Sequence, residues 1–184
     1  MIKQKIKIVN SAFLVFTSVL LFSCEKEVNK DTTTLNTNVV TEKVNETSSN
    51  ALVNLLNKEK YFSETTKLGS ERAQNKELKD FSLQASVSHN KIFDKIQLVS
   101  KDQNVKSSKD LPKDLNESLY KYTITNTADF DSYYYKNLIQ DYKNNLDSIA
   151  KEINDNESST AIQILKEMEG NYQKQIDLLE TIKL

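Results

Sequence analysis

The 184-residue chain contains few of the residues that interrupt helices or build covalent and metal-bound structure. It has two glycines, one proline, one cysteine, one histidine and no tryptophan. So few turn-forming residues disfavour a sheet protein with many tight turns. A single cysteine allows neither an internal disulfide nor a cysteine-based zinc site. The formal charge of −1 provides no basic footprint for a nucleic-acid partner. What is abundant, namely charged residues at 28% together with Leu and Gln, favours long helices in one domain.

The first 24 residues, MIKQKIKIVNSAFLVFTSVLLFSC, have the pattern of a bacterial export signal. Lysines at positions 3, 5 and 7 precede an uncharged apolar core at 11–22, which is shorter than the roughly 20 residues a spanning helix needs. The closing LFSC resembles the lipobox of bacterial lipoproteins, with Cys24 as the first mature residue. We therefore predict a signal peptide over 1–23 and lipidation of Cys24. An ordinary secretory signal and an uncleaved anchor are the alternatives.

The mature chain should be held at a membrane by its lipid alone. Removing three lysines leaves 22 basic against 26 acidic residues, a net charge of −4, which does not attract anionic headgroups. The expected location is the bacterial cell envelope, at the outer membrane, on its periplasmic or surface face. Residues 24–49 are polar and rich in Thr and Asn, and they predict a flexible tether. An ordered strand at TNVVTEKV (37–44) is the alternative.

Residues 50–184 have the periodicity of amphipathic helices. Apolar residues recur every three or four positions, most clearly over 76–102 and also over 50–73, 129–153 and 158–179. A loop marked by Ser107, Ser108 and Pro112 separates the halves, and a short helix is expected at 115–124. These segments predict an all-α, antiparallel four-helix bundle. A trimer of longer hairpins and an extended coiled coil are the alternatives.

Three residues on these apolar faces are unusual. Glu59 places a charge on the face of the first helix and weakens its stripe. Gly69 narrows the same face and would permit a close approach between helices. His89, the only histidine, occupies a position on the second helix where an apolar residue is expected.

Several segments resemble a bacterial family called domain of unknown function 4142. They are LGSERAQNKELKDF (68–81), SHNKIFDKI (88–96) and FDSYYYKNLIQDY (130–142). The residues that keep the family pattern are Arg72, Ala73, Asn75, Leu78, Lys79, Phe81, Phe130, Asp131 and Tyr134. The resemblance covers about 51–182 and implies an exported, ferritin-like four-helix bundle with no established activity. Relatives carry a second and a third histidine where this chain has Tyr142 and Gln175.

His89 is therefore interpreted first as a packed residue. A ferritin-like di-iron centre needs Glu-x-x-His, but Ser86 stands three residues before His89, and zinc needs three or four ligands. We expect His89 to be hydrogen-bonded to Tyr142 or Tyr134, and the candidate buried polar cluster is His89, Tyr134, Tyr142 and Gln175. No cofactor is expected, and a metal held by His89 is the alternative.

The sequence favours a non-enzymatic function. It contains no Gly-rich phosphate loop, no nucleophile elbow and no paired catalytic carboxylates. The leading hypothesis is an envelope lipoprotein that interacts with another envelope protein or buffers envelope stress. A metal-binding ferritin-like domain using His89 is the first alternative, and a surface-exposed adhesin or ligand-binding lipoprotein is the second.

Overall fold

The computed structural model describes residues 46–156 and 158–184. These residues form five helices and no strand, which confirms the predicted all-α class for the described part of the chain. The helices are α1 (Glu46–Arg72), α2 (Lys76–Asp102), α3 (Lys113–Ile124), α4 (Phe130–Asp155) and α5 (Ser159–Leu179). All five lie in one compact unit, Thr41–Leu184. The predicted signal peptide, Cys24 and the tether up to residue 45 lie outside the described residues.

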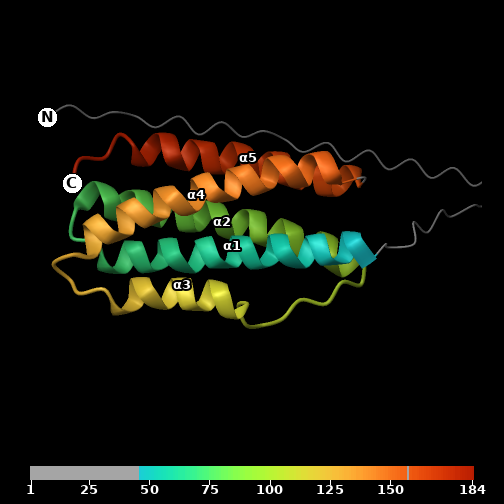
Figure 1. The fold of residues 1–184 in the computed structure, drawn as a ribbon, viewed down its shortest axis with the longest axis horizontal. Helices are drawn as coiled ribbons and strands as arrows, with labels where there is room; N and C mark the ends of the chain where they lie inside the picture. The colour runs from blue at the N-terminus through green and yellow to red at the C-terminus, as the bar shows by residue number, and fades with distance from the viewer. Residues whose placement is uncertain (1–45, 157) are drawn as a thin grey trace, which may run out of the picture. The chain divides into compact units, whose positions relative to one another are not determined.

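The helices are arranged as two antiparallel hairpins with one shorter helix beside them. α1 and α2 form the first hairpin, α4 and α5 form the second, and α3 lies against α1 (Figure 1). Contacts between α2 and α5 join the hairpins. α1 begins at Glu46, so the last residues of the predicted tether are helical. The sequence pattern missed this turn because the apolar stripe begins only at Leu52, which is buried.

The predicted stripes form the core. The α2 stripe is buried from Leu78 to Ile96, and the α4 stripe is buried at Phe130, Tyr134, Leu138, Tyr142 and Ile149. Full burial of each large apolar side chain contributes about 1.5–3 kcal/mol, so these stripes dominate the packing energy. The sequence spacing predicts the α5 stripe as Ile162, Leu165, Met168, Tyr172, Ile176 and Leu179, and it needs one correction at its start. Ala161 and Ile164 are buried there, whereas Ile162 is half-buried.

Local side-chain contacts fix where the helices start. Asn75 caps α2 by accepting from the Leu78 amide at 3.0 Å, and Ser158 caps α5 by accepting from the Ala161 amide at 3.4 Å. Asp129 directly precedes α4, but its side chain makes no capping bond. The loop after α2 turns at Asn104, whose φ of 57° lies in the left-handed region that Asn tolerates.

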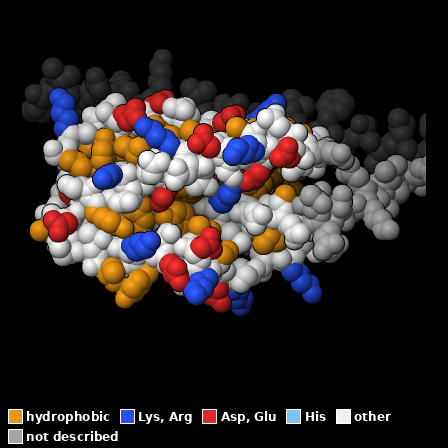
Figure 2. Space-filling model, viewed as in Figure 1, with side chains coloured by type: hydrophobic (Ala, Val, Ile, Leu, Met, Phe, Trp, Pro, Cys, Tyr) orange, Lys and Arg blue, Asp and Glu red, His pale blue; other side chains and the backbone are white. Residues whose placement is uncertain are grey.

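The surface mixes charges of both signs. On the face shown in Figure 2, basic and acidic side chains are interspersed, with apolar side chains between them. Charged side chains also pair across helices, such as the half-buried Lys58 with Glu152 at 2.6 Å and the exposed Lys143 with Glu180 at 3.0 Å. An exposed pair contributes at most about 1 kcal/mol to stability. None of the described helices has the length and apolar composition needed to cross a bilayer.

Candidate functional site

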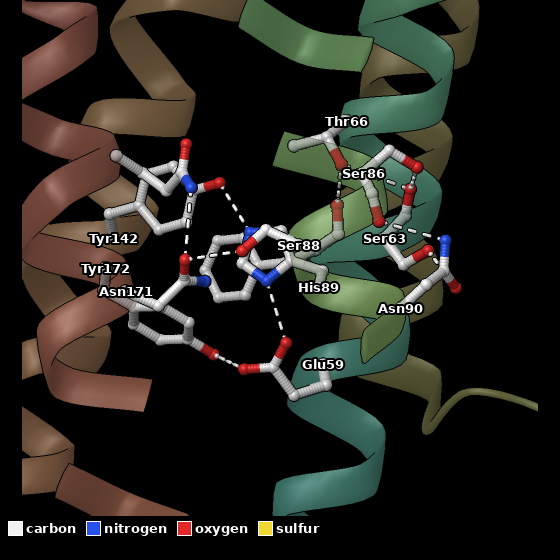
Figure 3. Close-up of polar contacts among 12 residues, drawn as sticks. Glu59, Ser63, Thr66, Ser86, Ser88, His89, Asn90, Tyr142, Asn171 and Tyr172 are labelled. Carbon is white, nitrogen blue, oxygen red and sulfur yellow. Dashed lines mark hydrogen bonds and ion pairs between the residues drawn. The ribbon is translucent and has the colours of Figure 1, made fainter. Parts of the chain in front are cut away.

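Four polar side chains, one from each long helix, meet in the core (Figure 3). Glu59 of α1 places Oε2 2.8 Å from Nδ1 of His89 on α2. Nε2 of His89 lies 2.7 Å from the hydroxyl of Tyr142 on α4. The hydroxyl of Tyr172 on α5 donates to Oε1 of Glu59 at 3.0 Å. All four residues are 0% exposed, and we call them the core quartet.

The hairpin geometry explains why Glu59 and His89 meet. In an antiparallel pair, residues equidistant from the turn lie opposite each other. α1 ends at Arg72 and α2 begins at Lys76, so the turn centres on residue 74. Glu59 lies 15 positions before this centre (74 − 59) and His89 lies 15 positions after it (89 − 74). Glu59 and His89, the two polar residues that interrupt the apolar stripes, therefore lie opposite each other.

The polar atoms of the core quartet satisfy one another under a single proton assignment. Nδ1–H of His89 donates to the Glu59 carboxylate, and the Tyr142 hydroxyl donates to Nε2. The Tyr172 hydroxyl donates to the other carboxylate oxygen. Because a buried polar atom without a partner costs about 1–3 kcal/mol, this complete pairing makes the burial tolerable.

Aromatic rings enclose the core quartet. Phe62 stacks on Tyr142 with ring centroids 4.6 Å apart and on His89 at 5.2 Å. Burial raises the pKa of Tyr142 and of Tyr172 well above the ordinary tyrosine value, and the Glu59 carboxylate adds to both shifts. Both hydroxyls therefore stay protonated, and no substrate reaches them at 0% exposure.

The predicted polar cluster is only partly brought together. His89 and Tyr142 are in contact, whereas the Tyr134 hydroxyl bonds Ser82 at 2.9 Å. Gln175 donates to Asn171 of its own helix at 3.2 Å and is buried. Glu59 and Tyr172 complete the cluster, and the sequence interpretation did not assign them to it. The available signal was Glu59 itself, a charge on an apolar stripe at the same distance from the turn as His89.

A second polar cluster joins three helices. Tyr61 of α1 and Tyr122 of α3 both donate to Oδ2 of Asp141 on α4, at 2.6 and 2.9 Å. Burial raises the pKa of the Asp141 carboxyl, while the two hydroxyl donors partly offset the shift. These bonds attach the short α3 to the hairpins.

The residues that carry the family resemblance gather where the α1–α2 turn meets the α3–α4 turn. The Arg72 guanidinium donates to the carbonyls of Tyr122 at 2.6 Å and Thr123 at 2.7 Å, near the end of α3. It also lies 4.4 Å from the ring centroid of Phe130. A cation at the end of a helix compensates its unpaired carbonyls, so Arg72 fixes α3 in place.

Other residues of the resemblance act at the same junction. Asp131 accepts from the backbone amide of Asn75 at 2.7 Å, which ties α4 to the start of α2. Gly69 lets the Tyr134 ring approach closely, because a Cβ added there would lie 2.3 Å from Cζ of Tyr134. Leu78 and Phe81 are buried in the core, whereas Lys79 is exposed. The residues that match the family pattern therefore serve mainly to hold the helices and turns together.

An open groove lies on the outside of the first hairpin. Its volume is about 360 Å³, at the small end of ligand-site sizes. α1, α2 and the loop after α2 form its walls, and six of the eleven lining residues carry an amide or a hydroxyl group. The lining residues are Leu56, Asn57, Lys60, Ser63, Glu64, Asn90, Phe93, Gln97, Ser107, Ser108 and Lys109.

Within residues 46–156 and 158–184, no three His, Cys, Asp or Glu side chains are grouped as a metal-ligand set. His89, the weak metal candidate, has both ring nitrogens in contact with protein atoms. A metal at either nitrogen would have to displace Glu59 or Tyr142.

Comparison with known proteins identifies one family. A family model described as "Domain of unknown function (DUF4142)" matches residues 35–182, which is most of the chain. No curated protein and no solved structure matches the chain significantly.

Proposed function

This chain belongs to the DUF4142 family. On that premise we propose that it is a bacterial envelope protein held at the membrane by a lipid. Its helical domain binds another envelope protein and catalyses no reaction. The core quartet is the observation that carries the non-catalytic part of the proposal. A general acid or base must lie within about 3 Å of the proton that it transfers, directly or through one water. Glu59, His89 and Tyr142 are 0% exposed and bonded to one another, which supports a structural role.

The finer fold proposal is a ferritin-like four-helix core made of α1, α2, α4 and α5. Each of these helices supplies one member of the core quartet. α3 is then an addition, held against the core by Arg72 and Asp141.

The anchor rests on the order of charged segment, apolar segment and Cys24 in the sequence. Replacing Cys24 by Ala should abolish fatty-acid labelling and release the protein from membranes. Ser23→Ala keeps a small residue before the cysteine and is the matched control, in which labelling should persist. Labelling retained in Cys24→Ala would contradict the anchor.

The groove beside α1 and α2 is the proposed contact with the partner. Asn57 and Gln97 supply amide donors and acceptors that pair with an extended polypeptide backbone. A photo-crosslinking residue at position 97 should capture one discrete envelope protein in living cells. The control places the photo-crosslinking residue at position 174, where Lys174 is exposed on α5 and lies outside the groove. Equal adducts from both positions, or none from position 97, would contradict this location.

Two further measurements separate the other functional classes. Stoichiometric metal in the purified chain, lost in His89→Ala, would overturn the proposal in favour of a metal-binding domain. Protease added to intact cells distinguishes a periplasmic partner from an adhesin role, because only a surface-exposed domain is cleaved.

A further inference from the structure

The contact between Tyr142 and His89 has a chemical consequence beyond stability. A phenol that loses an electron becomes a strong acid and must give up its proton at once, so a base already in hydrogen-bond contact makes oxidation easier. Nε2 of His89 lies 2.7 Å from the Tyr142 hydroxyl. Behind the ring, the Glu59 carboxylate lies 2.8 Å from Nδ1 and stabilises the positive charge that the imidazole gains.

We propose that Tyr142 is a redox-active tyrosine that undergoes reversible one-electron oxidation with proton transfer to His89. An outer-sphere one-electron oxidant, such as an oxidised metal complex or a peroxyl radical, takes one electron from the phenol. The O–H bond breaks and its proton forms an N–H bond at Nε2. The products are a neutral tyrosyl radical, an imidazolium paired with Glu59 and the reduced oxidant. Return of an electron from a one-electron reductant such as ascorbate reverses both transfers.

Burial makes the radical long-lived. Tyr142 and His89 are 0% exposed, so solutes and a second tyrosyl radical cannot reach the ring. The chain has no tryptophan, and its one cysteine is at position 24, so tyrosines are the readily oxidised aromatic side chains of the described helices. Burial raises the pKa of Tyr142, which excludes simple prior deprotonation as the route to oxidation.

Neighbouring rings provide an inner path for the electron. The Tyr142 ring stacks on Phe62 at 4.6 Å, and Phe62 meets the ring of Tyr61 edge-on at 5.3 Å. These separations between rings are contact distances, so an electron can leave Tyr142 without any opening of the core.

From Tyr61 the path continues to the surface through Tyr122 and Tyr133. Tyr61 and Tyr122 donate to the same oxygen of Asp141, which gives each of them a proton acceptor as well. The ring of Tyr122 lies 5.5 Å from that of Tyr133, which is half-buried and reaches solvent. Every tyrosine on the path from Tyr142 to Tyr122 therefore donates to a base.

The test is electron paramagnetic resonance of the full chain in detergent, oxidised by a flash-generated ruthenium(III) polypyridyl complex. Because His89 is the only histidine, labelling histidine with ¹⁵N marks one possible partner of the radical. The expected result is a long-lived tyrosyl radical with hyperfine coupling to the ¹⁵N label. This measurement needs no variant and does not depend on the folding of a mutant.

Variants then assign the residue. Tyr142→Phe keeps the ring stack and should abolish the coupled signal, while Tyr120→Phe, at an exposed tyrosine outside the path, should leave it unchanged. His89→Gln should lower the radical yield to that of Tyr142→Phe. A radical without coupling to ¹⁵N-histidine, a ¹⁵N-coupled radical that persists in Tyr142→Phe, or no radical longer-lived than that of free tyrosine would each overturn the proposal.

Discussion

Replacing His89 by Leu should lower the free energy of unfolding by about 3–5 kcal/mol, because it leaves a buried carboxylate without its main partner. In the wild-type protein, Glu59 receives Nδ1–H at 2.8 Å and the Tyr172 hydroxyl at 3.0 Å. The variant keeps only the second bond. It also leaves the Tyr142 hydroxyl without its acceptor at Nε2. Domains of this size have stabilities of about 5–15 kcal/mol, so the variant remains measurable or is close to unfolding.

The partner substitution gives the comparison that tests this reasoning. Glu59→Leu leaves two donors stranded, Nδ1–H of His89 and the Tyr172 hydroxyl, and each costs about 1–3 kcal/mol. The double variant carries no buried charge, and replacing a buried polar pair by apolar residues is often neutral or stabilising. The double variant should therefore lose about 2–3 kcal/mol less than the sum of the single losses.

Urea denaturation of the full chain, followed by circular dichroism, measures all three variants. Lys91→Ala, at an exposed position on α2, is the control and should change stability by less than about 0.5 kcal/mol. Single losses that add within about 0.5 kcal/mol would refute the coupling between Glu59 and His89. A loss below about 1 kcal/mol for His89→Leu would refute the claim that the histidine compensates a buried charge.

Four other substitutions test the junction, the second cluster and an open position on α5. Gly69→Ala should destabilise the fold by about 1–3 kcal/mol, because the added Cβ would meet the buried Tyr134 ring. Gly170→Ala has nothing within 4 Å of the added Cβ and should stabilise the fold by about 0.5–1 kcal/mol. The midpoints of urea denaturation measure both effects. Burial raises the pKa of Asp141, so the folded state binds this proton more tightly than the unfolded state. The free energy of unfolding should therefore fall as pH rises from about 4 through the raised value, and Asp141→Asn should flatten that slope in urea titrations across pH. Arg72→Lys loses the two-pronged contact with the α3 carbonyls, so hydrogen exchange in α3 should accelerate while exchange in α2 stays unchanged.

The helices could be predicted well because each one carries its own signal. The apolar stripe over 76–102 coincides with α2, Lys76–Asp102, and Asn75, an Asn directly before that stripe, caps it. Helix periodicity and caps depend on residues a few positions apart, which a single sequence displays directly. The start of α1 could not be placed, because its first turn precedes the apolar pattern.

The core quartet could be predicted only in part, because its contacts span helices. The sequence marks His89 as unusual and Tyr142 as a possible partner, whereas Glu59 looks only like a charge that weakens its apolar stripe. Glu59 and His89 are 30 positions apart, and only the position of the turn places them opposite each other. Tyr172, 113 positions from Glu59, has no local signal that separates it from an ordinary core tyrosine.

The family resemblance points to residues that meet in the structure, but it does not reveal what they do there. Arg72, Asn75 and Asp131 look like candidates for a binding site when read as motif residues. In the structure each one pairs with backbone groups at the junction of two turns. A motif shows which residues recur together, whereas their purpose depends on what lies next to them in three dimensions.

The most direct test of the central claim, a sealed and internally satisfied polar core, is ¹⁵N NMR of the single histidine. The account predicts a proton on Nδ1 of His89 that exchanges slowly with water, because Glu59 accepts it and no solvent reaches the ring. A ring N–H that exchanges as fast as that of an exposed histidine would contradict the account.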